Sequence, residues 1–275
     1  MTSQTEKYAA FKALHEAEGA FVMPNPWDAG SAKMLANLGF GALATTSAGL
    51  AFSLGKRDSA AALTREEVLE NARAIVEATD LPVSTDLENG FGDLPEDCAN
   101  TVRLAAATGL AGGSIEDATG RSDDPIYAFE PAVERVRAAA EAVRDLPFLL
   151  TARAENFLWG RPDLDDTIRR LQAFERAGAD VLYAPGLPDL DAIKTVCDAV
   201  SRPVNVVMGL SGPVFSVDAL SRAGVRRVSV GGSFARAALG ALRQAAEEVL
   251  NKGTFTYSRS ALPDTEAARL TADRR

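Results

Sequence analysis

Short apolar runs alternate with amphipathic stretches along nearly the whole chain of 275 residues. The runs are continuous, as in strands buried on both faces, whereas the stretches between them repeat apolar side chains at helical spacing. The helical patterns cover residues 65–78, 95–108, 131–143, 164–177, 189–200, 216–223 and 234–249, with one more helix at the front of the chain. The apolar runs cover residues 20–23, 41–45, 81–85, 112–115, 147–151, 180–183, 203–207 and 227–230.

This alternation predicts a parallel sheet that helices cover on both faces. Eight strand–helix units in about 250 residues fit a (β/α)₈ TIM barrel better than an open doubly wound sheet. We therefore expect an α/β barrel with an extra N-terminal helix. No break in composition interrupts residues 1–250, which predicts a single domain there. Residues 251–275 are polar and charged, so we expect a C-terminal tail that is frayed or lies against a neighbouring subunit.

Charge and composition exclude several classes of partner. A net charge of -9 and a pI near 4.8 argue against a nucleic-acid or anionic-membrane surface, so local groups must hold any anionic substrate. Cys98 and Cys197 lie in separate helical patterns without metal spacing, which fits a reducing cytosol. No apolar run approaches a membrane span, and the polar start lacks a signal-peptide core. We expect a cytoplasmic protein.

Acidic side chains follow two of the predicted strands. Asp86 and Glu88 come directly after one buried run, and Glu116 follows the next. Because the carboxyl ends of parallel strands meet at one edge of a barrel, these carboxylates should lie close together. Such a cluster repels itself unless it holds a hard cation, and oxygen ligands without His or Cys suit Mg²⁺ or Mn²⁺. The sequence therefore predicts a divalent-metal site at Asp86, Glu88 and Glu116.

Other polar residues fall at the same predicted edge. Arg153 comes just after a buried strand, where an unpaired guanidinium is costly, so it pairs either with a carboxylate such as Glu155 or with a substrate carboxylate. We favour the substrate. Asp117 either joins the acidic cluster or forms a salt bridge to a neighbouring loop, and Asn205 lies within a strand. The lone histidine, His15, is on the leading helix, so histidine acid–base chemistry is not expected.

Two segments of small residues suggest anion sites, each with a plain structural alternative. Ser47, Ala48 and Gly49 lie in a strand-to-loop turn, where backbone N–H groups can approach an anion, or where the chain simply turns. The pair Gly231 and Gly232 follows the last strand and is typical either of a phosphate cradle or of close helix packing.

Six motifs occur in the order and spacing of the isocitrate lyase/phosphoenolpyruvate mutase superfamily, and the chain resembles that family from residue 20 to about 250. They are Asn25-Pro-Trp-Asp28, Thr46-Ser-Ala-Gly49, Gly55-Lys-Arg-Asp58, Thr85-Asp-Leu-Glu-Asn-Gly-Phe-Gly92, Ser114-Ile-Glu-Asp117 and Thr151-Ala-Arg153. Members are (β/α)₈ barrels that use Mg²⁺ to hold a 2-oxo acid or its enolate while a neighbouring C–C or P–C bond is made or broken. Many exchange their last helix with a neighbour, so the resemblance implies an exchanged last helix and a homodimer or homotetramer.

The resemblance also implies roles for individual residues. Asp86 would bind the metal, with Glu88 and Glu116 completing its shell largely through water. Asp58 matches the acidic residue of a mobile gate loop, and Arg153 matches the arginine that grips the substrate. Asp58 or Glu155 could accept a proton if burial raised its pKa. The residues that we expect beside the substrate are Trp27, Ser47, Ala48, Gly49, Asp86, Arg153 and Asn205.

Departures from the family narrow the chemistry. Lyases of isocitrate type carry a Lys-Lys/Arg-Cys-Gly-His loop after strand four, whose cysteine protonates the leaving carbanion, and residues 118–127 replace that loop here. Phosphonopyruvate mutases follow the gate Asp with Ser-Asn and place a lysine after the Glu-Asp pair, whereas this chain has Ser59-Ala60 and Ala118. We predict a Mg²⁺-dependent lyase that breaks a C–C bond in a small 2-oxo or 2-hydroxy dicarboxylic acid of oxaloacetate, malate or isocitrate type, through a metal-stabilised enolate. The alternatives are P–C chemistry on phosphonopyruvate and a non-catalytic barrel that binds 2-oxo acids.

Two further segments predict assembly and motion. Phe234, Ala238 and Leu242 repeat at four-residue spacing beside Ala235 and Leu239, which predicts an apolar stripe that one barrel leaves uncovered, and hence at least a dimer. Residues 50–64 form an unusually long connection with a glycine and a cationic pair, so they are either a lid over the metal or a long surface loop.

Overall fold

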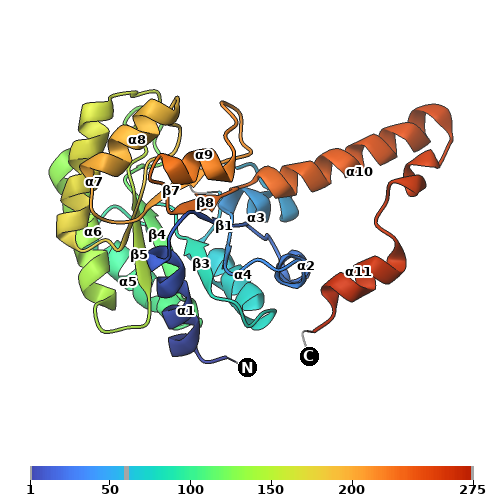
Figure 1. Ribbon diagram of the computed structural model, residues 1–275, viewed down its shortest axis with the longest axis horizontal. Coiled ribbons are helices and arrows are strands. Elements are labelled where there is room, and N and C mark those ends of the chain that lie inside the picture. Colours follow the sequence, from blue (N-terminus) through green and yellow to red (C-terminus); the bar gives the residue numbers. More distant parts are fainter. Residues whose placement is uncertain (1, 59–61, 274–275) are drawn as a thin grey trace.

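The computed structural model describes residues 2–58 and 62–273. Within them, eight parallel strands lie in the order β1-β8-β7-β6-β5-β4-β3-β2. The Ala44 N–H donates to the Pro24 carbonyl (3.0 Å) between β1 and β2, so the sheet is nearly closed. The predicted (β/α)₈ TIM barrel is confirmed (Figure 1). The strands are β1 Phe21–Met23, β2 Leu43–Ala44, β3 Val83–Asp86, β4 Gly112–Glu116, β5 Leu149–Arg153, β6 Val181–Tyr183, β7 Val204–Val207 and β8 Arg227–Ser229.

Helices surround the barrel, and each predicted helix is present. In the described part of the chain they are α1 Gln4–Glu16, α2 Ala29–Asn37, α3 Ser47–Ser53, α4 Arg65–Glu77, α5 Pro95–Ala106, α6 Phe129–Val143, α7 Leu164–Ala177, α8 Leu190–Ala199, α9 Val217–Arg222, α10 Ser233–Lys252, the 3₁₀ helix η1 Thr256–Arg259 and α11 Asp264–Thr271. The sequence pattern did not predict α2, α3, η1 or α11. Across residues 2–58 and 62–273, no helix combines the length and apolar character that crossing a membrane requires.

The segment Ser47–Ser53 corrects one expectation. It is a helix, α3, and not the turn that the sequence suggested. Thr46 caps this helix, since its side chain accepts a hydrogen bond from the Gly49 N–H. Ser47, Ala48 and Gly49 therefore form the first turn of a helix whose N-terminus lies at the end of β2.

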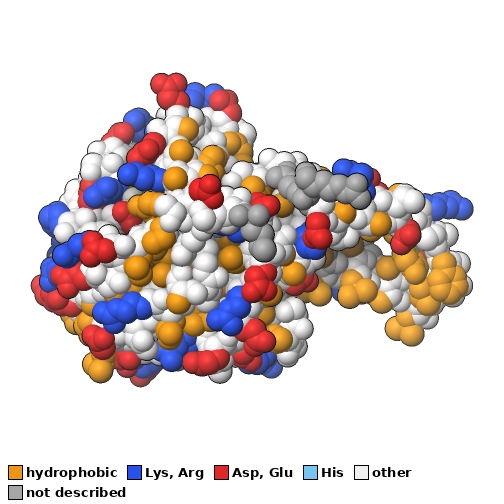
Figure 2. Space-filling view, turned by 90° about the horizontal axis from the view of Figure 1, so that it is seen from below, with side chains coloured by type: hydrophobic (Ala, Val, Ile, Leu, Met, Phe, Trp, Pro, Cys, Tyr) orange, Lys and Arg blue, Asp and Glu red, His pale blue; other side chains and the backbone are white. Residues whose placement is uncertain are grey.

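The C-terminal segment leaves the barrel and returns to it. α10 projects away from the barrel, and α11 comes back to lie against α2 (Figure 1). Asn37 donates hydrogen bonds to the carbonyls of Leu270 (2.8 Å) and Ala272 (3.0 Å), and the Leu270 side chain is buried. Part of the predicted polar tail is thus ordered against its own barrel. Hydrophobic side chains gather on the projecting arm, which consists of α10 and the segment that follows it (Figure 2).

Candidate active site

Four neighbouring strands end in polar side chains at the C-terminal edge of the barrel. Asp86 ends β3, Glu116 ends β4, Arg153 ends β5 and Tyr183 ends β6. In the sheet register Glu116 lies beside Arg153, and Arg153 lies beside Tyr183. Parallel strands in this register bring the four side chains to one rim, as the sequence predicted for Asp86, Glu116 and Arg153.

Arg153 joins three carboxylates at the centre of this rim. Its Nη1 lies 3.1 Å from Asp86 Oδ1, and its Nη2 lies 3.1 Å from Glu116 Oε2. Its Nε donates to Glu155 Oε1 at 2.8 Å. The ion pair with Glu155, the alternative that we did not favour from the sequence, is therefore present, and contact with a substrate carboxylate remains a prediction. One guanidinium cannot neutralise three carboxylates, and burial raises the pKa of Glu116 well above its usual value.

Ser47 and Gly49 show why the first turn of α3 needs small residues. Ser47 Oγ donates to Asp86 Oδ2 at 2.9 Å, so α3 and β3 are joined at the site. A Cβ at Gly49 would lie 2.7 Å from Thr46 and 2.8 Å from Trp27, so a larger residue would push α3 out of place. Trp27 thus packs beneath α3, and of the described residues neither it nor Gly49 lines the cavities at the rim.

The loop after β3 has strained backbone at two residues. Glu88 and Phe91 adopt positive φ angles of 47° and 59°, which residues other than glycine rarely take. The carbonyl of Glu88 accepts from the Glu116 N–H (2.9 Å), and its N–H approaches Asp86 Oδ1 (3.3 Å). Strain of this kind is held only where surrounding structure enforces it and is frequent at functional sites. Here it places Glu88 at the rim with the other acids.

Two adjoining cavities open at this rim. The larger, about 880 Å³, is bordered by Glu88, Glu116 and Glu155, and the smaller, about 230 Å³, extends into the barrel toward Asn205. The residues that line both are Ser47, Asp58, Asp86, Arg153 and Leu158. A small carboxylic acid fits this combined space.

Asp58 lines both cavities, and its role in a gate stays a prediction. Partial burial, with repulsion from Asp86 in second place, raises its pKa. Residues 59–61 of the predicted gate lie outside the described residues. Two aromatic residues line the larger cavity, Phe91 and Trp159. Sequence reasoning missed Trp159, from the loop after β5, because nothing in its local pattern marks it.

The donor chemistry of the rim fits a hydrated hard cation. Among the described residues, no three carboxylate, His or Cys side chains are close enough to share one ion directly. One oxygen of Asp86 contacts Arg153 and the other accepts from Ser47. Mg²⁺ usually keeps several waters and takes only one or two carboxylates, so Asp86 as direct ligand with Glu88 and Glu116 acting through water stays compatible with this arrangement.

Asp117 has a structural role. It is buried, accepts a hydrogen bond from the Glu155 N–H (2.8 Å) and forms an ion pair with Arg170 of α7 (3.0 Å). Burial raises its pKa to about 7. Of the two roles that the sequence left open, the structure contains the salt bridge to a neighbouring element. Asp117 thereby fixes the backbone of Glu155 beneath Arg153.

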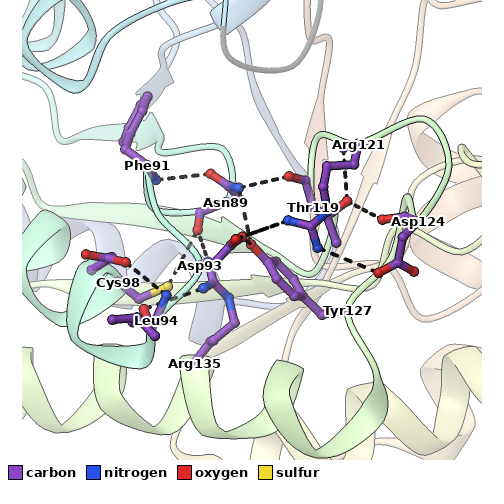
Figure 3. Close-up of polar contacts among 11 residues, drawn as sticks. Asn89, Phe91, Asp93, Leu94, Cys98, Thr119, Arg121, Asp124, Tyr127 and Arg135 are labelled. Atoms are coloured by element: carbon purple, nitrogen blue, oxygen red, sulfur yellow. Dashed lines mark hydrogen bonds and ion pairs between the residues drawn. The ribbon is translucent and has the colours of Figure 1, made fainter.

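The segment that follows β4 is tied to the loop after β3. Asp93 accepts hydrogen bonds from Tyr127 Oη (2.5 Å) and from Arg121 Nη1 (3.0 Å), and Arg121 also contacts Asp124 (Figure 3). Arg135 of α6 lies over the Tyr127 ring and donates to the carbonyl of Asn89. Residues 119–121 line the larger cavity, so this network holds one of its walls.

The smaller cavity has a polar lining that includes Asn205, which the sequence predicted beside the substrate, and two residues that sequence reasoning did not identify, Ser229 and Arg227. Tyr183 lines the same cavity. The sequence signal was present, because a barrel interior is usually filled by branched apolar side chains and these strands carry an amide, a hydroxyl and a guanidinium instead.

Comparison with known proteins shows broad similarity. A family model described as phosphoenolpyruvate phosphomutase matches residues 11–250. The chain is 31% identical to 2-methylisocitrate lyase of Escherichia coli over 88% of this chain and 82% of that enzyme. It is 30% identical to oxaloacetate decarboxylase of Pseudomonas entomophila over 80% of this chain and 76% of that enzyme. The crystal structure of a Burkholderia cenocepacia protein described as a candidate lyase/mutase superposes with a TM-score of 0.95 at 57% identity, covering 98% of this chain and 97% of the other.

Proposed function

Because the chain belongs to the phosphoenolpyruvate mutase/isocitrate lyase superfamily, we propose that it breaks a C–C bond in a small 2-oxo or 2-hydroxy dicarboxylic acid with the help of Mg²⁺. The family is one of lyases and mutases, so the chain is an enzyme, as the sequence predicted. The bond that breaks lies next to the 2-oxo or 2-hydroxy group, and an enolate takes up its electron pair. Oxaloacetate, malate and isocitrate represent the substrate class.

The observation that carries this proposal is the acidic rim around Arg153. Three carboxylates contact one guanidinium, so the rim holds more negative charge than the arginine neutralises. A divalent cation would remove that excess, and Arg153 would then be free to pair with a substrate carboxylate. Ser47 Oγ donates to Asp86 here, and with Asp86 on the cation this hydroxyl would be free to donate to the oxygen on which negative charge develops.

Each group has a separate task in the reaction. Arg153 would bind and orient the carboxylate, and Ser47 and the first turn of α3 would hold the 2-oxo end by hydrogen bonds. When bound, Mg²⁺ supplies a Lewis acid that stabilises negative charge on the 2-oxo oxygen. The candidate bases are Glu155, which is buried next to Arg153 with its pKa raised by burial, and Asp58, which lines both cavities.

Asp86→Ala tests the metal and the function together. A panel of oxaloacetate, malate-type and isocitrate-type acids should be turned over with Mg²⁺ and not in EDTA. Asp86→Ala should lower turnover at least 10³-fold, an effect on the order of that seen when a charged transition-state partner is lost, and should weaken Mg²⁺ binding in calorimetry.

The control for this variant is Asp218→Ala, which removes an exposed carboxylate paired with Arg222 on α9. It should behave like the wild type. Unchanged wild-type turnover in EDTA would remove the metal from the proposal.

The family model, described as a phosphomutase, supports one second candidate. Phosphonopyruvate therefore belongs in the same panel, with release of phosphate and formation of phosphoenolpyruvate as readouts. Turnover of phosphonopyruvate alone would favour P–C chemistry over C–C cleavage.

A further inference from the structure

The proposed reaction needs a group that protonates a carbanion, and the site lacks the cysteine loop that has this role in isocitrate-type lyases. The cavities are also without histidine or cysteine among their described lining residues. Tyr183 lines the smaller cavity, with its ring 5.0 Å from the Arg153 guanidinium, and its phenol is a further candidate for this acid.

The hydrogen bonds that lead to Tyr183 start at a buried arginine. Arg227 is 3% exposed and forms no ion pair with any described carboxylate. Its Nε donates to Asn205 Oδ1 at 2.8 Å. Because a guanidinium has only donors, the oxygen of the Asn205 amide must face Arg227. The amide NH₂ then points the other way, and it donates to Ser229 Oγ at 3.1 Å.

The same order of hydrogen-bond donors leads on to the phenol of Tyr183. Tyr183 and Ser229 line the same cavity, and Ser229 acts on Tyr183 in the sense of lowering its pKa, which is the effect of a hydroxyl that donates toward the phenol oxygen. Because Ser229 Oγ accepts from the Asn205 amide, its own hydrogen is available for Tyr183. The donors from Arg227 through Asn205 to Ser229 are therefore ordered toward Tyr183, and the phenol hydrogen is not needed within this series.

The surroundings of Tyr183 keep its phenol protonated at neutral pH and stabilise the phenolate that forms when it gives up the proton. Burial raises the pKa of Tyr183, so the phenol is protonated at neutral pH. Burial lowers the pKa of Arg227 to about 9, so the guanidinium is still cationic there. A directed chain that begins at a cation stabilises a phenolate at its other end. Glu116 and Glu155 do not line the smaller cavity, unlike Tyr183.

The geometry points to Tyr183 as the acid that protonates the carbanion carbon, with Ser229, Asn205 and Arg227 as its positioning residues. This assignment rests on the proposed function, because it needs an enolate in the cavity. When the C–C bond of a 2-oxo dicarboxylic acid breaks, its electron pair remains on the 2-oxo-acid fragment as an enolate; when that of a 2-hydroxy acid breaks, the pair remains on the other carboxylic-acid fragment. The Tyr183 O–H bond then breaks, its proton forms the new C–H bond at the enolate carbon, and the phenolate takes a proton from water.

Proton exchange separates this step from bond cleavage. With Mg²⁺ in D₂O, the wild type should exchange the C3 hydrogens of pyruvate and 2-oxobutyrate for deuterium, which proton NMR measures without any C–C cleavage. Tyr183→Phe should lower that exchange about 10²- to 10⁴-fold, the usual contribution of a general acid. It should bind oxalate like the wild type, which shows that the cavity is intact.

Two further variants complete the design. Ser229→Ala keeps the phenol but removes the hydroxyl beside it, so hydrogen exchange should fall less in this variant than in Tyr183→Phe. In the exchange reaction the Tyr183 phenolate is the base that removes the C3 proton. The exchange rate of the variant should therefore fall further as the pH is lowered and the phenolate fraction decreases. Tyr8→Phe makes the same chemical change on α1, where Tyr8 packs against a buried apolar cluster that includes Phe11 and Leu149, and should exchange at the wild-type rate.

The outcomes separate the two proposals. If Tyr183→Phe exchanges the C3 hydrogens at the wild-type rate, the assignment of Tyr183 is overturned and the lyase proposal still stands. Exchange by the wild type without cleavage of any dicarboxylic acid would overturn the lyase proposal and support the role of Tyr183. If the wild type binds oxalate but neither exchanges nor cleaves, both proposals are wrong.

Discussion

His15, the lone histidine of the chain, is held as one neutral tautomer beneath the barrel. Its Nδ1 lies 2.8 Å from the Phe11 carbonyl, which can only accept, so Nδ1 carries the proton. Its Nε2 lies 3.4 Å from Arg227 Nη1, which can only donate, so Nε2 accepts. The imidazole thereby supports the buried arginine, and it does not line either cavity at the rim.

A titration of His15 should reflect this environment. Burial, with repulsion from Arg227 in second place, lowers its pKa from 6.5 to about 3. Between those values the unfolded chain binds a proton that the native protein does not, so the free energy of unfolding should fall as the pH falls from about 6.5 toward 3. Its ring signals in NMR should stay constant from pH 5 to 8 in the folded protein and titrate near 6.5 in urea. A folded-state midpoint near 6.5 would contradict the buried, neutral assignment.

Single residues of the site differ in how far the sequence could predict them. The meeting of Asp86, Glu116 and Arg153 follows from strand order alone, because consecutive parallel strands end at one rim. The ion pairs of Asp117 and the packing of Trp27 depend on α7 and α3, whose positions no local pattern contains. The role of Tyr183 depends on the direction of a hydrogen-bond chain through two other strands, which only three-dimensional structure supplies.

At the scale of elements, short helices were harder to predict than strands. α2 and α3 are rich in Ala, Gly and Ser, so their apolar face has no clear period, although Asp28 and Thr46 provide N-cap signals before them. The eight strands were predictable because each is a continuous apolar run. The alternation of strands with the longer helices was therefore enough to predict the barrel, whereas the shape of its rim was not.

The tie between the loops after β3 and β4 can be tested at Asp93. Asp93→Ala removes the acceptor of both Arg121 and Tyr127. Because Asp93 is exposed, the change in the free energy of unfolding should be small, about 1 kcal/mol or less, while amide hydrogen exchange in residues 119–127 should become faster.

Asp123→Ala, in the same loop, is the matched control and should leave exchange unchanged. If Asp93→Ala also leaves exchange unchanged, the loop is held chiefly by its own backbone bridge between Ala118 and Ile126.

At the scale of the whole molecule, the projecting α10 predicts self-association. Phe234, Leu239 and Leu242 of the predicted stripe are 38%, 45% and 66% exposed on the single chain, whereas Ala235 is buried against the barrel. Helix exchange with a second copy would cover this face, so we expect a dimer or tetramer in sedimentation at micromolar concentration. Leu242→Glu should shift the protein toward monomer.

Val214→Glu is the control, since Val214 is 84% exposed in the loop after β7 and lies outside α10. A wild-type monomer would contradict the assembly, and equal dissociation by both variants would show that added charge alone causes it.

The left-handed backbone at Glu88 has a consequence for attempts to engineer this protein. A non-glycine residue at φ 47° costs on the order of 1–3 kcal/mol, and glycine would relieve that cost. Selection for heat resistance alone would therefore favour glycine at position 88 and delete a carboxylate of the acidic rim. The most thermostable version of this barrel and its working version are different sequences, and they diverge at the loop after β3.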